Sequence, residues 1–154
     1  MSETTGLVAF LRARLDEDYK LAFEAGNGGP EHWKFDPELP WNGDNGPREA
    51  IVRFNGSALG YVAAVDPVHG KYGTWGARHI ARHDPARVLA EVNAKRRILD
   101  ELLDEIDERD RTYQVEYWDH FMGPYRPLTD QLLRLLALPY ATHPDYRPEW
   151  APPA

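Results

Sequence analysis

Two histidines, His79 and His83, stand four residues apart in the chain. Four residues make about one turn of an α-helix, so both imidazoles would face one side of a helix and could hold the same metal ion. A zinc-type site needs further ligands, for which the sequence offers His69, Asp66 and His143. The alternative is polar packing where two helices meet. We favour that alternative, because a chain with six histidines easily places two of them at this spacing.

The chain lacks the other residues that a metal hydrolase or a nucleophilic enzyme requires. In the H-E-x-x-H zinc motif a glutamate follows the first histidine, whereas Ile80 follows His79 here. The absence of cysteine excludes disulfides, thiolate catalysis and cysteine-ligated zinc. The glycines of segment 69–76 do not have the order of a phosphate-binding loop, and no serine motif accompanies Asp119 and His120. We therefore predict no catalytic residues and no cofactor, with a divalent metal such as zinc as the alternative.

Two cations, Lys95 and Arg96, fall inside the apolar sector of a predicted helix, near Val88 and Leu102. A buried cation needs a partner of opposite charge. The functional interpretation is a pair of cations that binds a small anion in a cleft. The alternative, which we favour, is that the aliphatic stems cover apolar surface while the charged groups reach water or a carboxylate.

Aromatic side chains gather in a long loop, residues 26–47, and in a Pro-rich tail, residues 139–154. Loops of this length without periodicity are often either functional or disordered. Packing against the edge of the core is the commoner role for such rings, and a protein-binding surface is the functional one. The candidate binding residues of these two segments are Trp33, Phe35, Trp41, Tyr146 and Trp150.

The composition limits the classes of partner. The net charge of −7 opposes binding to a phosphate backbone, and no basic stripe is present, so we exclude nucleic acid. No apolar run approaches the ~20 residues of a membrane span, and the N-terminus lacks the basic and apolar regions of a secretory signal. We expect a cytoplasmic protein that binds a protein partner or forms a homo-oligomer, with no membrane contact.

Helical periodicity and turn residues predict the first half of the fold. Apolar residues recur at every fourth position over 5–25, which predicts an amphipathic helix. The pair Asn55-Gly56 favours a tight turn, so residues 50–54 and 59–65 are predicted to form a β-hairpin. A two-stranded hairpin is barely stable alone, and a helix must cover one of its faces.

The histidine pair is placed by two successive helices. A short helix is predicted over 74–83, and the proline at 85 disfavours helical geometry at the residue before it. Asp84 then caps the next helix, with Pro85 in its first position. This long central helix is predicted to continue to about residue 111.

The C-terminal part is predicted to be a helix followed by an aromatic tail. Residues 128–138 are apolar on nearly all sides, which predicts a deeply buried helix. The tail, 139–154, is expected to lie extended across the body, 1–138. The complete prediction is a mainly helical α+β fold in a single domain of 154 residues.

Five segments carry distinctive motifs: LVAFLRARLDED from Leu7, HIARHDPARVL from His79, AKRRIL from Ala94, LLRLLALPYA from Leu132 and HPDYR from His143. These segments resemble small proteins of actinobacteria and their phages that share a domain of unknown function. The resemblance implies a single intracellular domain. It supplies no activity and no catalytic residues.

Three functions are consistent with these residues. The first, which we favour, is a non-catalytic interaction or regulatory protein that binds through the aromatic loop and the tail. The second is a metal-dependent enzyme or sensor that uses His79, His83 and a third ligand. The third is a small-anion binder that uses Lys95 and Arg96.

Overall fold

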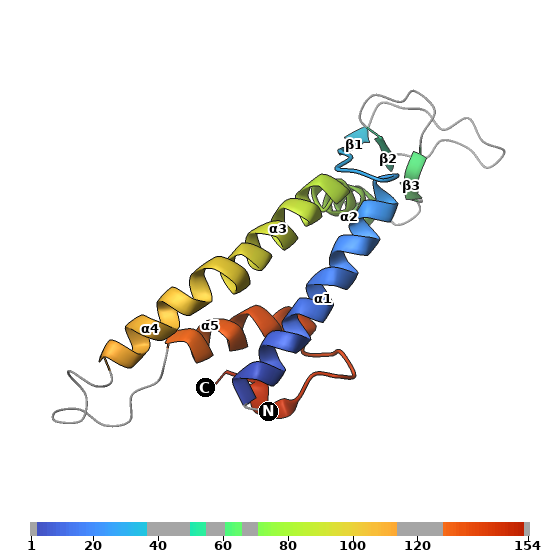
Figure 1. Ribbon diagram of the computed structural model, residues 1–154. Coiled ribbons are helices and arrows are strands. Elements are labelled where there is room, and N and C mark those ends of the chain that lie inside the picture. Colours follow the sequence, from blue (N-terminus) through green and yellow to red (C-terminus); the bar gives the residue numbers. More distant parts are fainter. Residues whose placement is uncertain (1–2, 37–49, 55–60, 66–70, 114–127, 153–154) are drawn as a thin grey trace. The chain divides into compact units, whose positions relative to one another are not determined.

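A computed structural model describes residues 3–36, 50–54, 61–65, 71–113 and 128–152 of the chain (Figure 1). The described part is mainly helical with one small antiparallel sheet, which confirms the predicted α+β class. None of its helices is long and apolar enough to cross a membrane. The elements are α1 (Glu3–Ala25), β1 (Trp33–Asp36), β2 (Ala50–Phe54), β3 (Tyr61–Val65), α2 (Lys71–Arg82), α3 (Pro85–Arg97), η2 (Ile98–Leu102), α4 (Leu103–Tyr113), α5 (Leu128–Ala137), η4 (Leu138–Tyr140) and η5 (Pro148–Trp150).

The contacts divide the chain into two compact units. Unit 1 comprises Met1–Glu17 and Val92–Ala154, and unit 2 comprises Asp18–Glu91. The boundary falls within two continuous helices, α1 and α3, so each of these helices contributes residues to both units.

Unit 2 contains the sheet, in the order β1-β2-β3 with antiparallel neighbours. Strands β2 and β3 confirm the predicted hairpin. Strand β1, however, lies inside the segment 26–47 that was predicted to have no regular structure. That prediction was wrong for Trp33–Asp36, because Trp33, Lys34 and Phe35 alternate apolar and polar side chains over too short a run to stand out.

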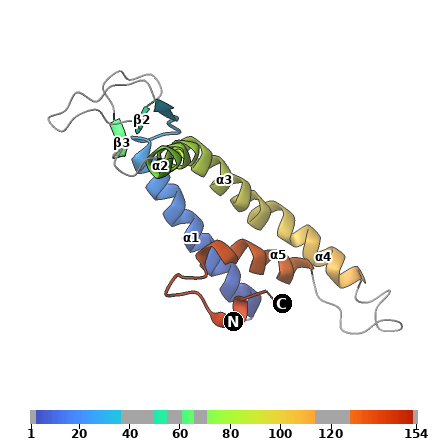
Figure 2. The same cartoon turned by 180° about the vertical axis from the view of Figure 1, so that it is seen from behind.

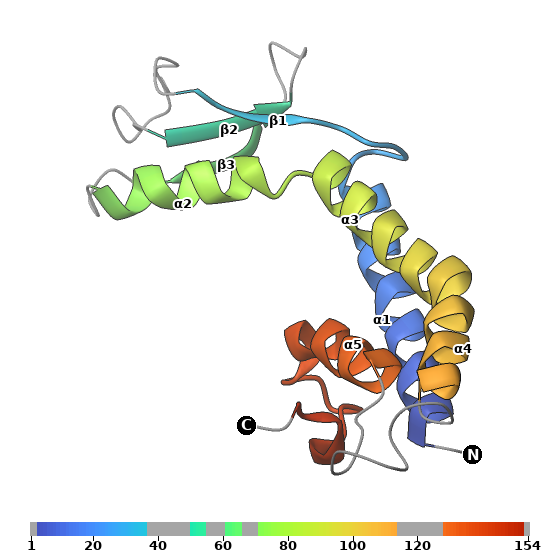
Figure 3. The ribbon, with the colours of Figure 1, turned by 90° about the vertical axis from the view of Figure 1, so that its left-hand side faces the viewer.

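Helix α2 covers one face of the sheet, as Figure 3 shows. Ala77 is fully buried at the centre of this contact, where a small side chain lets the helix approach the strands. Partly buried side chains of β1, β3 and α2 pack against it: Trp33, Phe35, Val62, Ala63, Ile80 and Ala81. The predicted helix over 74–83 is confirmed, and it begins earlier, at Lys71.

Asp84 begins α3 and also contacts β1, within unit 2. One oxygen of its carboxylate accepts a hydrogen bond from the Arg87 N–H at 2.8 Å, which confirms the predicted helix cap. The other oxygen lies 3.0 Å from His32 Nδ1 and 3.4 Å from the Trp33 nitrogen. The residue is 8% exposed, so three polar contacts satisfy a nearly buried carboxylate.

Unit 1 is built from the first turns of α1, the end of α3, η2, α4, α5 and the tail. The predicted central helix is confirmed as the continuous helical run from α3 to α4, interrupted only by the π-helical turn η2. Its buried side chains meet those of α1 in the core of the unit. That core includes Leu7, Leu11, Leu15, Val92, Leu99, Leu103, Leu133 and Trp150.

Helix α5 lies beside α4 in unit 1, as Figures 1 and 2 both show. The prediction that this helix is deeply buried was wrong. One stripe at every fourth position, Thr129, Leu133 and Ala137, is buried. In contrast, Leu128 and Leu135 are 54% and 55% exposed. An apolar composition on all sides does not supply a packing partner on all sides, and among the described residues one face of α5 is the buried one.

The tail is curled where the prediction had it extended. Two 3-10 turns, η4 and η5, shorten its course, and a backbone hydrogen bond joins the Tyr146 N–H to the His143 carbonyl at 2.9 Å. Proline at the first or second position starts both 3-10 turns. Trp150, in the second of these turns, is 2% exposed.

Candidate functional site

Unit 1 contains a groove of about 550 Å³, which we call the helical groove. Helices α1, α4 and α5 and the turn η2 supply its walls. Its lining combines five apolar side chains with three threonine hydroxyls and two charged side chains. The lining residues are Thr4, Thr5, Val8, Ala9, Arg12, Leu99, Leu103, Asp104, Thr129 and Leu133.

The acidic stretch of η2 and α4 runs past this groove. Asp104 and Glu105 are exposed, and the structure gives neither a cationic partner among the described residues. The Glu101 side chain, which accepts hydrogen bonds from Arg97, raises the pKa of that guanidinium. Three carboxylates of the stretch do have arginine partners, at distances between 2.9 and 3.2 Å: Asp100 with Arg12, Glu101 with Arg97 and Glu108 with Arg111.

A second pocket of unit 1, about 520 Å³, lies between α1 and the tail, and we call it the tail pocket. Gly6 allows close packing there, with the Trp150 ring 3.9 Å from the position that a Cβ would occupy. The lining residues are Gly6, Phe10, Ala13, Arg14, Pro144, Asp145, Tyr146, Arg147, Pro148 and Trp150.

Aromatic rings of the tail surround Phe10 beside this pocket. The Trp150 ring lies 5.0 Å from the Phe10 ring, and the Tyr146 ring lies 6.0 Å away in an edge-on arrangement. Two guanidinium groups cover this cluster: that of Arg14 lies 5.5 Å from the Phe10 centroid, and that of Arg147 lies 5.2 Å from the Trp150 centroid. Such cation–π contacts hold arginines against apolar rings.

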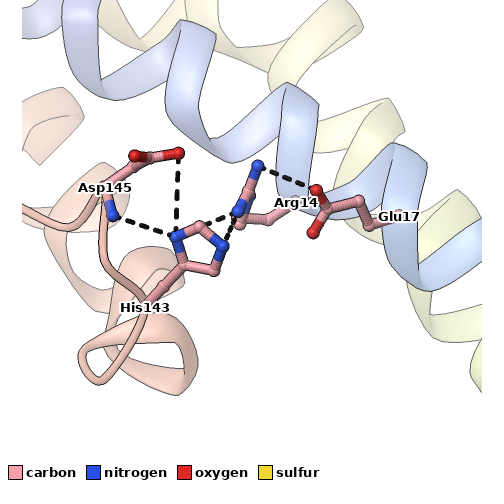
Figure 4. A network of polar contacts seen from close by, with 4 residues as sticks. All are labelled: Arg14, Glu17, His143 and Asp145. Carbon is pink, nitrogen blue, oxygen red and sulfur yellow. Dashed lines mark hydrogen bonds and ion pairs between the residues drawn. The ribbon is translucent and has the colours of Figure 1, made fainter.

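Arg14 is the centre of a polar network in the same place (Figure 4). The residue is only 7% exposed. One terminal nitrogen forms an ion pair with Glu17 at 3.0 Å, and the other contacts the His143 ring. The Asp145 backbone N–H donates to His143 Nδ1 at 3.1 Å. Nε of Arg14 is buried and has no hydrogen-bond partner among the described residues.

The histidine pair lies at the end of α2, in unit 2. Both side chains are exposed, and their ring centroids are 4.4 Å apart, so the two imidazoles face the same side as predicted. His69 and Asp66 lie outside the described residues, and His143 contacts Arg14 in unit 1. Within the described residues no group of three or more metal-binding side chains comes together.

Lys95 and Arg96 are half-buried near the end of α3. Arg96 forms an ion pair with Asp16 at 2.5 Å, so this cation already contacts a carboxylate. A pocket of about 130 Å³ beside it has both signs of charge in its lining, and Asp16 and Asp100 lie in that lining.

The aromatic candidates divide between the two units. Trp33 and Phe35 are half-buried in unit 2, where they pack against Ala77. Tyr146 and Trp150 come together in unit 1, with ring centroids 5.9 Å apart. Trp41 lies outside the described residues.

Sequence reasoning missed Arg14, although the signal was present. Arg14 falls within the apolar ladder of Leu7, Leu11 and Leu15 on α1. A cation inside an apolar helix sector is the criterion that singled out Lys95 and Arg96, and it applies to Arg14 equally.

The chain was compared with known proteins. No curated protein and no solved structure matches it. The model of one protein family, described as a family of unknown function (DUF6221), matches residues 4–152, which is nearly the whole sequence. This match agrees with the resemblance to a domain of unknown function that the sequence motifs carry, and the chain belongs to the DUF6221 family.

Proposed function

We propose that this protein is a non-catalytic interaction module that binds a basic, amphipathic helix of a protein partner in the helical groove. The observation that carries the proposal is the groove itself, whose lining combines apolar side chains with a carboxylate, Asp104, that has no cationic partner among the described residues. A volume of about 550 Å³ lies within the range of specific binding sites. Helix-in-groove recognition needs an apolar floor and a polar rim, and the lining of this groove supplies both.

The apolar floor favours a ligand with a hydrophobic face. Val8, Leu99, Leu103 and Leu133 line the groove on different elements, so a ligand there would contact α1, η2, α4 and α5 together. Additional apolar surface is exposed on α5 at Leu128 and Leu135. These two leucines do not line the groove, and they add apolar surface elsewhere on the same helix.

The charge favours a basic partner. Asp104 lies at the edge of the groove without a cationic partner among the described residues, and Glu105 follows it. The whole chain carries a net charge of −7, which speeds encounter with a basic surface. A helix with leucines on one face and lysines on the other matches both features.

A designed peptide tests this proposal. The probe is a labelled helical peptide of leucine and lysine with one apolar face, and the control is a scrambled peptide of the same composition that has no such face. Fluorescence anisotropy at low and physiological salt measures the affinity. We expect the amphipathic peptide to bind, the scrambled peptide to bind much more weakly, and added salt to weaken the binding.

Two matched pairs of variants locate the contact. Ala9→Arg places a bulky cation in the groove and should weaken binding by roughly tenfold. Ala94→Arg adds the same side chain at another exposed helical alanine of unit 1, outside the groove lining, and should leave binding unchanged. Asp104→Asn should weaken binding by about two- to fivefold, and Glu105→Gln by less.

The proposal is overturned if both peptides bind equally or if Ala9→Arg behaves like Ala94→Arg. It is also overturned if the wild-type chain self-associates in sedimentation experiments and Ala9→Arg abolishes that association. In that case the occupant of the groove is a second copy of the chain.

A specific observation also favours a second candidate function, a metal sensor that uses His79 and His83. The exposed rings lie 4.4 Å apart on one side of α2, which suits two imidazole ligands of a transition metal such as zinc. The predicted third ligand is His69. Native mass spectrometry of untagged protein with added zinc should show a bound metal ion in the wild-type chain.

The variants His79→Ala, His83→Ala and His69→Ala separate the possibilities. Loss of the metal in all three variants supports a three-ligand site. The control is His32→Ala, which removes an exposed histidine elsewhere in unit 2 and should leave the metal bound. A bare protein mass after zinc addition rules out the metal function.

A further inference from the structure

We propose that the tail pocket binds a small ligand through an oxyanion group, either a carboxylate or a phosphate. This inference is independent of the helical groove, since different residues line the two sites. The pocket volume of about 520 Å³ suits a small molecule. The argument rests on the donors around the pocket, on its charge and on its aromatic walls.

Three hydrogen-bonding groups of the lining residues are buried without a partner among the described residues. They are Nε of Arg14, Nε1 of Trp150 and the hydroxyl of Tyr146. Guanidinium and indole nitrogens only donate, and a phenol donates to any strong acceptor. Leaving a buried donor unpaired is unfavourable, and these three groups have no acceptor among the described residues.

His143 also faces more hydrogen-bond donors than it has acceptor nitrogens. A neutral imidazole has one acceptor nitrogen, because its other nitrogen carries a proton. In this structure two donors approach the ring, the Asp145 N–H and a terminal nitrogen of Arg14. Both donors reach the same ring nitrogen, Nδ1, and so they share its one lone pair. A ligand oxygen would supply the acceptors that the protein does not.

The charge of the lining favours an anion. Two arginines, Arg14 and Arg147, and one carboxylate, Asp145, line the pocket, and the ion-pair partner of Arg14, Glu17, lies outside the lining. Glu17, the carboxylate partner of Arg14, is 58% exposed in its side chain and so is well hydrated. Arg147 lies over the Trp150 ring and has no carboxylate partner among the described residues. A guanidinium group matches the geometry of carboxylate and phosphate oxygens.

The walls favour a ligand that also has an apolar body. Phe10, Tyr146, Trp150 and two prolines, Pro144 and Pro148, line the pocket. Rings and prolines offer contact area to a flat or apolar group at small cost in conformational entropy. Benzoate, acetate and inorganic phosphate are therefore informative probes. Benzoate has both parts, acetate has the carboxylate alone, and phosphate has the other oxyanion chemistry.

Nuclear magnetic resonance observes the unpaired donors directly. In the ¹⁵N-labelled full-length chain, the indole N–H of Trp150 and the Nε–H of Arg14 each give a separate signal. We expect both signals to move in a saturable way on titration with benzoate or with phosphate, and not with chloride at the same ionic strength. A stronger response to benzoate than to acetate and phosphate assigns an aromatic carboxylate, and a stronger response to phosphate assigns a phosphate-bearing ligand.

A matched pair of arginine variants provides the control. Arg147→Gln removes an exposed cation of the pocket and should weaken binding by about tenfold, the effect of one charge-assisted hydrogen bond. Arg97→Gln removes an exposed cation of α3 outside the pocket and should leave the affinity unchanged. Ala9→Arg, the groove variant, should also bind the anion normally, which separates this site from the proposed function.

The inference is overturned if neither donor signal moves with any of the three probes, because no ligand oxygen then reaches the donors. It is also overturned if chloride produces the same shifts, or if Arg147→Gln and Arg97→Gln change the affinity equally.

Discussion

At the scale of single residues, two buried charged side chains, Asp84 and Arg14, differ in the polar groups that contact them. Asp84 and Arg14 are each less than a tenth exposed, and they have opposite surroundings. Asp84 accepts from Arg87, His32 and Trp33, so all its contacts are with donors. Arg14 has more donor groups than acceptors around it. We therefore assign a structural role to the first residue and a binding role to the second.

Replacing Asp84 tests the structural role. Asp84→Ala removes the cap of α3 and the contact to β1, and we expect the free energy of unfolding to fall by about 2 kcal/mol. Asp84→Asn keeps an oxygen that can cap the helix and should lose less. The control, Glu91→Ala, breaks an exposed helical ion pair with Arg87 and should cost about 0.5 kcal/mol or less. Urea denaturation measures all three, and equal losses for Asp84→Ala and Glu91→Ala would show that the carboxylate has no special role.

At the scale of the element, α5 shows how little composition says about burial. Its leucines are chemically identical, yet Leu133 is fully buried and Leu135 is 55% exposed. The difference arises because Leu133 lies on the stripe that faces the core of unit 1, together with Thr129 and Ala137. The exposed leucines of this helix are available to a partner, which is consistent with the proposed interaction function.

The two leucines form a matched pair for mutation. Leu133→Ala leaves a cavity in a packed core, and we expect it to lower the free energy of unfolding by about 2–5 kcal/mol. Leu135→Ala removes exposed surface and should change it by less than about 0.5 kcal/mol. Thermal denaturation followed by circular dichroism gives the comparison. Similar effects at both positions would mean that Leu135 is covered in solution, for example by a second copy of the chain.

At the scale of the whole molecule, each of the two units buries apolar side chains of its own. Unit 1 has a leucine core closed by Trp150, and unit 2 packs α2 on the sheet around Ala77. Helices α1 and α3 pass from one unit into the other. Parts of a protein with their own cores often open as separate cooperative units, even where the chain between them is continuous.

Native-state hydrogen exchange tests this division. We expect Leu133→Ala to reduce the protection of amides in α5 and α4 much more than that of Val62 and Ala63 in β3, because only the core of unit 1 is damaged. The wild-type chain under the same conditions is the reference. An equal loss of protection in both units would mean that the chain unfolds as one cooperative body.

The sequence by itself determined those features whose signals are local. The cap at Asp84, the hairpin strands and the two helices predicted over 74–83 and from Pro85 to about residue 111 follow from neighbouring residues, and the structure confirms them. Local rules suffice there because caps, turns and helical periodicity depend on atoms only a few residues apart. The spacing of His79 and His83 also predicted that their rings would face one side.

The tertiary structure alone decided which surfaces are covered and which polar groups meet. Strand β1 exists because β2 offers it a hydrogen-bonding edge, and one face of α5 is buried because the core of unit 1 covers only that face. The tail pocket depends on the meeting of Arg14 with His143, which are 129 positions apart in the sequence. No local pattern specifies such a contact, since it forms only when long-range packing closes the loop between the two residues.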